Sequence, residues 1–496
     1  STPLYSSAAS DVYKRQKIGR LYTNMTLPVK ASMWYLACSV LQKAIGFLTT
    51  PIFTRVMGIS DFGVVSMYNS WEAIFTVFCT LYLYNGVYNN AMIEYKYDKD
   101  GFTSSMQTLT TVLSVAVFGV VYVFYGHLSG VIGLSRPIMF LMVIDIIFST
   151  GMSFWSIRNR YEYKYKSVAA FTILSSLLMP VLSVILVLNS AEHKAEARIL
   201  GTVVTHVIVY GIVYFLNLTR GKKAVDLKYW KYGIKFNLPL IPHYLSSTIM
   251  TQSDRVLINT LCGSSAAGIY SISTNVTSIM NIVTVSINQA VTPWIYEMLE
   301  AKKMKEIGKN VYKIVSLVGV GFVLTSFIVP EVIGVLAPSE YKSAIWATPP
   351  LLIGMFMYFI YCNFGNVEIY FHKQNAMLFS SVTVAVINII LDYILIQKYG
   401  YIAASYATMV SYYIYAGLHY MFMSRVCKEK KVENPFNASV IIVMTIVFSV
   451  LIMCPALLYR VVLLRYSILA VICIICLVWA IKNRDFILQL ISKKRV

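Results

Sequence analysis

The residues best suited to chemistry in this 496-residue chain are ionisable side chains within long apolar stretches. Lys43 lies near the middle of the stretch 31–53, about 18 Å of helix from either end. A charge at mid-bilayer costs about 2.5–3.5 kcal/mol on insertion scales, so such residues usually pair internally or mark the path of a substrate or ion. Arg55, Asp254 and Arg255 lie toward the ends of such stretches, where long side chains can also reach the membrane surface. Four carboxylates lie in or near the middle of apolar stretches: Glu72, Asp145, Glu368 and Asp392.

Uncharged polar residues follow single helical faces in several of these stretches, recurring at intervals of three and four residues. Isolated Ser or Thr residues of this kind usually hold membrane helices together, at about 0.6 kcal/mol per hydrogen bond. The Asn-rich line over 271–288 suits a water-filled cavity better. The candidate cavity-lining residues are Gln42, Thr50, Asn69, Glu72, His243, Asp254, Asn275, Asn281 and Asn288.

The composition indicates an all-α, polytopic membrane protein. Hydrophobic residues make up 57% of the chain and charged residues 13%, whereas a soluble protein has about a quarter charged residues. The net charge of +20 lies mostly in loops between apolar stretches, where it acts as a topology signal rather than as a nucleic-acid footprint. Of the eight cysteines, Cys473 and Cys476 alone have Cys-x-x-Cys spacing, and they lie within an apolar run; the cysteines are interpreted as small apolar residues, and no metal site is predicted.

Since about 20 apolar residues cross a bilayer, the sequence predicts about fourteen transmembrane helices. They cover roughly 31–53, 62–88, 105–125, 137–157, 168–189, 199–218, 236–261, 267–290, 311–336, 344–371, 376–396, 402–424, 438–459 and 466–481. Roughly 32 of the 42 basic residues fall on one side of this arrangement, which predicts that both termini are cytoplasmic. The connections on the other side are short, so no external domain is predicted and an enzyme is not expected.

An internal repeat organises the predicted helices. Gly58, Ser60, Gly63 and Ser66 recur 205 residues later as Gly263, Ser265, Gly268 and Ser271. Spans one to six and seven to twelve therefore form two six-helix bundles related by a parallel repeat. The predicted regions are a cytoplasmic tail over 1–29, an N-terminal bundle over 30–221, a C-terminal bundle over 222–427, and two extra helices with a basic tail over 428–496. Residues 1–16 resemble a translated adaptor and are left out of this assignment.

Three segments carry a resemblance to a known family. The segments 41–63 (LQKAIGFLTTPIFTRVMGISDFG) and 252–273 (QSDRVLINTLCGSSAAGIYSIS) resemble the first-helix and seventh-helix signatures of bacterial polysaccharide flippases of the Wzx (O-antigen) type. The segment 288–297 (NQAVTPWIYE) is similar to the end of their eighth helix. These proteins form the polysaccharide-transporter branch of the MOP exporter superfamily, which also contains the MATE transporters.

The resemblance implies a flippase in the bacterial cytoplasmic membrane. Its expected substrate is an undecaprenyl-pyrophosphate-linked oligosaccharide used for O-antigen, capsule or related polymers, moved by alternating access. Lys43, Arg55 and Arg255 can supply cationic partners for the pyrophosphate. Lys43 matches a basic cavity position of the related lipid II flippases, whereas Thr49 stands where those proteins carry Arg. Expected partners are the lipid-linked oligosaccharide, membrane lipids, and a polysaccharide polymerase or chain-length regulator, with no nucleic acid.

No cofactor is expected, although Asp145, Asp392 and Glu368 are candidates to carry a coupling proton or sodium ion. Two transport alternatives stay open: a small-molecule cation antiporter of the same superfamily and a lipid II flippase. An antiporter would favour an acidic cavity, which Lys43 argues against. A membrane polymerase or ligase usually needs a large outer loop, which is not predicted here. A scaffold without transport would have no use for charges in the membrane.

Overall fold

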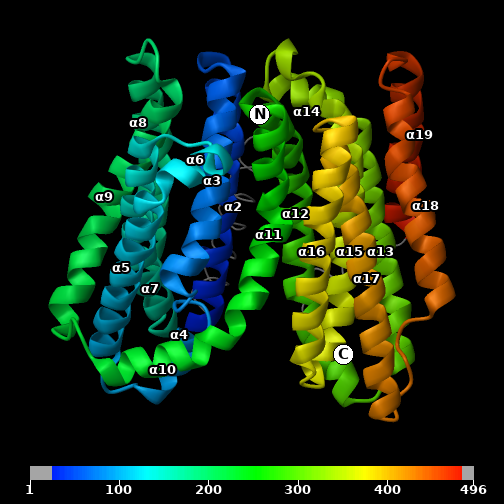
Figure 1. The fold of residues 1–496 in the computed structure, drawn as a ribbon. Helices are drawn as coiled ribbons and strands as arrows, with labels where there is room; N and C mark the ends of the chain where they lie inside the picture. Colours follow the sequence, from blue (N-terminus) through cyan, green and yellow to red (C-terminus); the bar gives the residue numbers. More distant parts are fainter. Residues whose placement is uncertain (1–24, 483–496) are drawn as a thin grey trace, which may run out of the picture. The chain divides into compact units, whose positions relative to one another are not determined.

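The computed structural model describes residues 25–482, and within that range the regular elements are helices (Figure 1). The predicted all-α membrane fold is thus confirmed, whereas residues 1–24 of the predicted cytoplasmic tail and residues 483–496 of the basic tail lie outside the described part. The longer helices are α2 (Leu27–Val56), α3 (Ile59–Thr80), α5 (Lys99–Val123), α7 (Arg136–Tyr161), α8 (Tyr165–Leu188), α9 (Lys194–Gly221), α11 (Ile241–Cys262), α12 (Ser264–Glu300), α13 (Met304–Phe327), α15 (Ala344–Tyr370), α16 (Gln374–Tyr399), α17 (Ala403–Glu429), α18 (Ala438–Leu457) and α19 (Val462–Lys482). The shorter ones are α4 (Val87–Glu94), α6 (Tyr125–Ile132), α10 (Leu227–Asn237), η1 (Leu238–Leu240), α14 (Val329–Leu336) and η2 (Ser339–Tyr341).

Each of the predicted spans overlaps one of the longer helices. Among the described residues, nine helices are long and apolar enough to cross a membrane, which establishes a multi-pass membrane protein. The helices α3, α11, α12 and α17 are not among the nine, and α19 contributes only the shorter apolar segment Val462–Ile475. Helices α3, α11 and α12 carry polar residues, which lower their mean hydropathy. The count of fourteen transmembrane helices therefore stays a prediction.

Three predicted spans are not single α-helices; one of them, 236–261, begins in the end of α10 and passes through η1 before α11. The span 62–88 breaks after Thr80 and resumes as α4 at Val87, because Leu81 and Tyr82 adopt left-handed φ values of 46° and 49°. An α-helix cannot continue through two such residues. The span 311–336 likewise breaks at Ile328, between α13 and α14, and Pro330 lies in the first turn of α14, where a missing backbone N–H costs nothing.

The chain packs as two compact units. Unit 1 contains residues up to Met57 and Trp71–Tyr244, and unit 2 contains Gly58–Ser70 and the chain from Leu245 onward. These units are defined by internal packing, whereas the predicted bundles follow the sequence repeat. The predicted boundaries at 221 and 427 therefore stay predictions.

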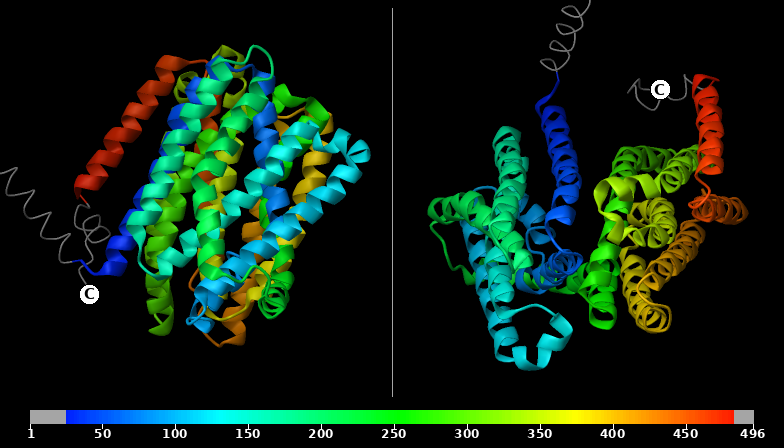
Figure 2. Two further views of the ribbon diagram at one scale, coloured as in Figure 1. Left: turned by 90° about the vertical axis from the view of Figure 1, so that its left-hand side faces the viewer. Right: turned by 90° about the horizontal axis from the view of Figure 1, so that it is seen from above.

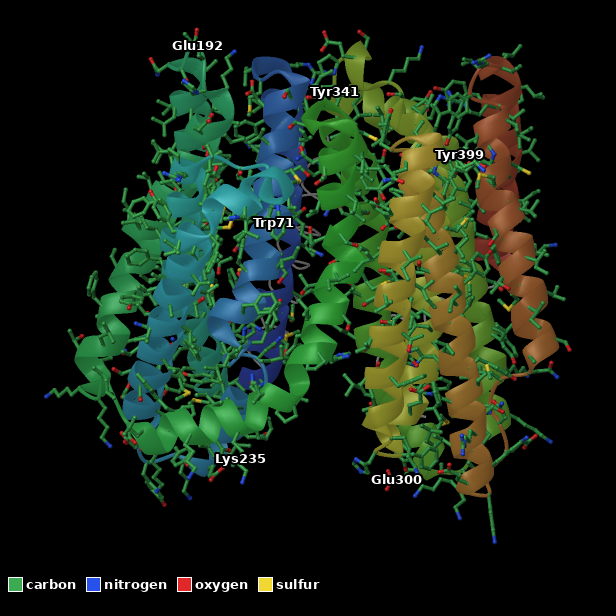
Figure 3. All side chains as sticks on the ribbon, in the orientation of Figure 1. Trp71, Glu192, Lys235, Glu300, Tyr341 and Tyr399 are labelled. Carbon is green, nitrogen blue, oxygen red and sulfur yellow. The ribbon has the colours of Figure 1, made fainter. Side chains whose placement is uncertain are left out.

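In unit 1, loops predicted to face opposite sides of the membrane lie at opposite ends. Glu192, between α8 and α9, marks one end, and Lys235 of α10 marks the other (Figure 3). Asp226 precedes α10 as its N-cap, and its side chain accepts hydrogen bonds from the backbone nitrogens of Lys228 and Tyr229. The aromatic face of α10 joins a core of buried residues from α4, α5 and α7: Leu83, Val87, Tyr88, Ala91, Met92, Phe102, Met106, Leu109, Phe154 and Tyr229.

In unit 2, the central helix is α15, which packs against α12 and α17 and is mostly buried. Helices α18 and α19 lie at one edge of this unit (Figure 2). At the crossing of α3 and α12, Gly63 and Gly268 allow the two backbones to approach closely. A Cβ on either glycine would lie 3.1 Å from the backbone nitrogen of the other. Small residues at such crossings are typical of membrane helix pairs.

Candidate functional site

The basic residues of α2 lie on an unusually exposed helix. Lys43 is exposed at the middle of α2, and no carboxylate of residues 25–482 forms an ion pair with it. Arg55, in the last turn, donates to the carbonyl oxygen of Pro51 at 2.9 Å. The two cations are 12 residues apart, or about 18 Å along the axis. Of the three basic residues of α2, Lys30, Lys43 and Arg55, Lys43 is therefore the one at the middle of the helix.

The neighbouring predicted residues of α2 and α3 differ in exposure. Gln42 is exposed beside Lys43, whereas Thr50 is buried and its hydroxyl donates to the carbonyl oxygen of Gly46. Asn69 is exposed and Glu72 is half-buried, one turn apart on α3. Gln42, Asn69 and Glu72 remain accessible enough to meet a polar ligand, whereas the hydroxyl of Thr50 is already used by its own helix.

Asp145 has a partner that sequence reasoning missed. Its carboxylate on α7 hydrogen-bonds to Nδ1 of His206 on α9, and both side chains are largely buried. The imidazole stacks on Tyr210, with ring centroids 4.5 Å apart, and the Tyr210 hydroxyl donates to Ser175 at 3.1 Å. A buried carboxylate is tolerable when it is paired in this way.

Glu368 has an equivalent partner in unit 2. Both of its oxygens lie 3.1 Å from Nδ1 of His419, and neither side chain is exposed. Tyr361 stacks on the imidazole at 5.0 Å, while Nε2 of His419 is buried without a hydrogen-bond partner among the described residues. In each unit, a carboxylate on the fourth predicted span of a bundle thus meets a histidine on the sixth.

Asp392 is in a different situation. It is fully buried on α16, and neither carboxylate oxygen has a hydrogen-bond partner among the described residues. Asn388 lies one turn earlier on the same face, and its amide nitrogen also lacks a partner, as does the hydroxyl of Thr408 on α17. Asp254 is near enough for its charge to act on Asp392. Unpaired buried oxygens are costly, so the carboxylate of Asp392 is suited to a proton or a bound cation, whereas the unpaired amide nitrogen of Asn388 is a donor and its oxygen already accepts from Ser253.

The remaining predicted residues of unit 2 lie on α11 and α12. Asp254 accepts a 2.7 Å hydrogen bond from Tyr270, whereas the Arg255 guanidinium donates to Gln252 at 2.7 Å and to the carbonyl oxygen of Thr251 at 3.0 Å. The Asn residues of α12 (Asn275, Asn281 and Asn288) are half-buried, and Asn288 accepts a 3.2 Å hydrogen bond from Asn366 of α15.

The predicted residues are divided between the units. Unit 1 holds Gln42, Lys43, Thr50, Arg55, Glu72, Asp145 and His243, and unit 2 holds Asn69, Asp254, Arg255, Asn275, Asn281, Asn288, Glu368 and Asp392. Within the units, Asp254 lies near enough for its charge to act on Asp392, and Asp145 lies near enough for its charge to act on Glu72. A joint pyrophosphate site formed by Lys43, Arg55 and Arg255 stays a prediction.

Comparison with known proteins gives the family. A family model described as "Polysaccharide biosynthesis protein" matches residues 29–299. A protein of the Lsg locus of Haemophilus influenzae is 23% identical over 339 residues, which cover 67% of this chain and 79% of that protein. A second membrane protein of Haemophilus influenzae, itself uncharacterised, is 25% identical over 313 residues, covering 61% of this chain and 74% of that protein.

Solved structures show the same fold at low sequence identity. The lipid II flippase MurJ, in an inward closed conformation, is 14% identical with a TM-score of 0.68, covering 91% of this chain and 99% of MurJ. A multidrug resistance MATE family transporter of the MOP superfamily, in an inward-facing conformation, is 14% identical with a TM-score of 0.61, covering 78% of this chain and 96% of that transporter. Both are transporters by name. The chain therefore belongs to the polysaccharide biosynthesis protein family and has the fold of the MOP-superfamily transporters.

Proposed function

We propose that this protein is a flippase that moves undecaprenyl-pyrophosphate-linked oligosaccharides across the bacterial cytoplasmic membrane by alternating access, for assembly of a surface polysaccharide such as O-antigen or capsule. The observation that carries the proposal is Lys43, an exposed cation at mid-depth of α2 without an ion-pair partner in residues 25–482. A cation kept there is costly unless an anion uses it. A pyrophosphate headgroup is such an anion.

The proposal assigns the headgroup contacts to Lys43, Arg55 and Arg255. The lysine acts as a compact point charge, and the arginines can form forked hydrogen bonds with phosphate oxygens. The different depths of Lys43 and Arg55 on α2 suit successive contacts along a path better than one fixed site. The lipid tail stays in the bilayer, so the protein needs to shield only the headgroup and sugars.

Outward movement of a negative headgroup is favoured by an inside-negative membrane potential, by about 2.3 kcal/mol per charge per 100 mV. The unpaired oxygens of Asp392 add a coupling-ion site in unit 2 to the proposal, and Asp254 lies near enough for its charge to act on Asp392. Antiparallel helices α16 and α17 are joined by residues 400–402, so Asp392 and Thr408 lie within about one turn of the same depth. Oxygen ligands of this kind take sodium, and a lone carboxylate takes a proton.

The proposal includes the orientation with both termini cytoplasmic, and partners that act on the flipped product, such as a polysaccharide polymerase or a chain-length regulator. No enzymatic step on the substrate is part of it.

The basic residues that predict this orientation include Arg158, which pairs with Asp100, and Lys223, which pairs with Asp98 beside α10. Lys235 of α10 is labelled at this end of unit 1 in Figure 3. Cysteine labelling of Glu192→Cys from outside intact cells, and of Lys235→Cys only after permeabilisation, would support this orientation; the reverse pattern would refute it.

The function itself is tested with purified protein in liposomes that contain a short fluorescent oligosaccharide on polyprenyl pyrophosphate. We expect time-dependent appearance of label in the second leaflet, and none in liposomes without protein. Lipid II tested in the same way separates a lipid II flippase from a polysaccharide flippase. Transport of an organic cation against a proton gradient, with no movement of either lipid, would instead establish the cation antiporter.

A further inference from the structure

The break between α3 and α4 is a strained turn that the fold holds in place. Leu81 and Tyr82 both have left-handed φ values, 46° and 49°, which non-glycine residues adopt only when the surroundings impose them. Such strained positions are concentrated at binding and catalytic sites. The turn occurs within a stretch predicted to be one membrane helix, so it needs a cause outside local sequence preference.

Asn237, the last residue of α10, imposes this turn. Its amide nitrogen donates to the carbonyl oxygen of Leu81 at 2.8 Å, and its amide oxygen accepts from the backbone nitrogen of Val87 at 2.8 Å. The Asn237 side chain is fully buried, and a Cβ on Gly86 would lie 3.2 Å from its Cγ. One side chain thus bridges both ends of the turn, and Gly86 leaves room for it.

The turn presents a row of rings, here called the ring row: Tyr84, Tyr82, Tyr244 and His243. Tyr82 stacks on Tyr244 with centroids 4.9 Å apart and an angle of 18°, and its centroid is 5.4 Å from that of Tyr84. His243 follows at 6.0 Å from Tyr244. Tyr84 is anchored edge-on against Phe154, which is fully buried. All four members of the ring row are half-buried, so part of each ring is accessible.

The chemistry of the ring row fits a sugar. The negative face of an aromatic ring attracts the C–H groups of a pyranose, and few polar groups beside it are needed for orientation. Glu72 lies near enough to Tyr84 for its charge to act on the phenol, and His243 ends the row, so acceptors and donors for sugar hydroxyls flank the rings. Lipid acyl chains form no hydrogen bonds, so these polar groups would not favour lipid binding.

We propose that the ring row is a carbohydrate-binding platform in unit 1, which holds pyranose rings of the transported oligosaccharide. This inference rests on the proposed function for its choice of sugar. The turn lies at the end of unit 1 that α10 covers, which is the cytoplasmic end in the predicted orientation. A platform there would meet the oligosaccharide on the side where it is assembled on its carrier.

The test uses sugar binding rather than transport, so its failure differs from failure of the flippase proposal. Full-length protein in detergent is mixed with chitotetraose or maltotetraose, its aromatic protons are saturated, and transfer of saturation to the sugar C–H protons is measured by NMR. We expect transfer in the wild type for at least one probe. The double variant Tyr82→Leu/Tyr244→Leu should reduce it at least about fivefold, and Tyr82→Phe/Tyr244→Phe should preserve most of it because the faces remain.

Tyr97→Leu is the matched control, because Tyr97 is 91% exposed and outside the ring row. It should leave saturation transfer unchanged. Size-exclusion profiles and thermal unfolding show whether each variant is folded. If the double Leu variant does not fold, the double Phe variant still tests the proposal. The proposal is overturned if the Leu pair binds like the wild type, if the Phe pair loses binding, or if the wild type shows no transfer to either probe. It is also overturned if a planar aromatic cation takes saturation while the sugars do not.

Discussion

The hydroxyl groups of Ser66 and Ser271 hydrogen-bond to each other in the interior of unit 2, and the two residues hold the same position in the internal repeat, 205 residues apart. Gly63 and Gly268, the neighbouring repeat pair, also meet backbone to backbone. Residues that are equivalent in the repeat therefore contact each other where α3 crosses α12.

We expect Gly63→Ala to destabilise the crossing of α3 and α12. The new Cβ would collide with the backbone carbonyl of Ser264, which cannot move like a side chain. Overpacking of this kind costs about 1–3 kcal/mol, seen as a lower midpoint of thermal unfolding in detergent. Gly417→Ala is the control, because a Cβ there meets no atom within 4 Å. Equal unfolding midpoints for wild type and Gly63→Ala would contradict close backbone packing of α3 against α12 at Gly63.

Asp98 should give unit 1 a pH-dependent contribution to stability. Burial opposes ionisation, but hydrogen bonds from Lys223 and Tyr229, both at 2.6 Å, outweigh it and hold the pKa of Asp98 below its usual value. A lowered folded-state pKa stabilises the protein above the unfolded pKa of about 3.9, and the contribution is lost as the pH falls through the folded pKa.

Asp98→Asn should therefore lower the unfolding midpoint at pH 7, and the difference from wild type should shrink below about pH 4. Unfolding followed by intrinsic fluorescence between pH 7 and pH 3 measures this. Glu192→Gln, at the exposed opposite end of unit 1, should show no such difference (Figure 3). A difference that stays constant or grows toward pH 3 would contradict the assigned hydrogen bonds.

The buried pair of Glu368 and His419 should show strong coupling in a double-mutant cycle. His419→Leu leaves a fully buried carboxylate without its partner, at a cost of about 3–5 kcal/mol. Adding Glu368→Leu removes that charge, so the double variant should recover much of the loss. The exposed pair of Lys373 and Glu429, 2.8 Å apart, should show coupling below about 1 kcal/mol. Additive effects at Glu368 and His419 would mean that the two side chains do not form a stabilising pair.

Asp392→Asn should remove the dependence of transport on the coupling ion. The amide keeps the shape of the carboxylate but not its charge, so a cation held there would be lost. The measurement compares flipping rates in liposomes with sodium or proton gradients. Glu340→Gln, exposed in η2, is the control. A variant whose rate still responds to the same gradient as the wild type would exclude this site.

The helical fold and the repeat could be predicted from the sequence because apolar length and the Gly/Ser pattern are local signals. The turn at Leu81 could not, since neither Leu81 nor Tyr82 is a residue that favours a turn, and Asn237, which bridges it, comes about 150 residues later. Charged candidates such as Asp145 could be identified from the sequence because a charge within an apolar span has a high free-energy cost. The histidine partners could not, because His206 and His419 lie 61 and 51 residues from their carboxylates. Only packing brings such pairs together.

We expect Lys43 to contact the headgroup of a lipid-linked oligosaccharide during flipping. The most direct measurement is the initial flipping rate of the fluorescent polyprenyl-pyrophosphate oligosaccharide in liposomes, for wild type, Lys43→Ala, Lys43→Arg and Lys166→Ala. The last replaces an exposed lysine of α8 in the same unit. We predict a loss of at least about tenfold for Lys43→Ala, corresponding to about 1.4 kcal/mol, partial activity for Lys43→Arg, and a normal rate for Lys166→Ala. Equal rates for wild type and Lys43→Ala would refute a role for Lys43 in flipping.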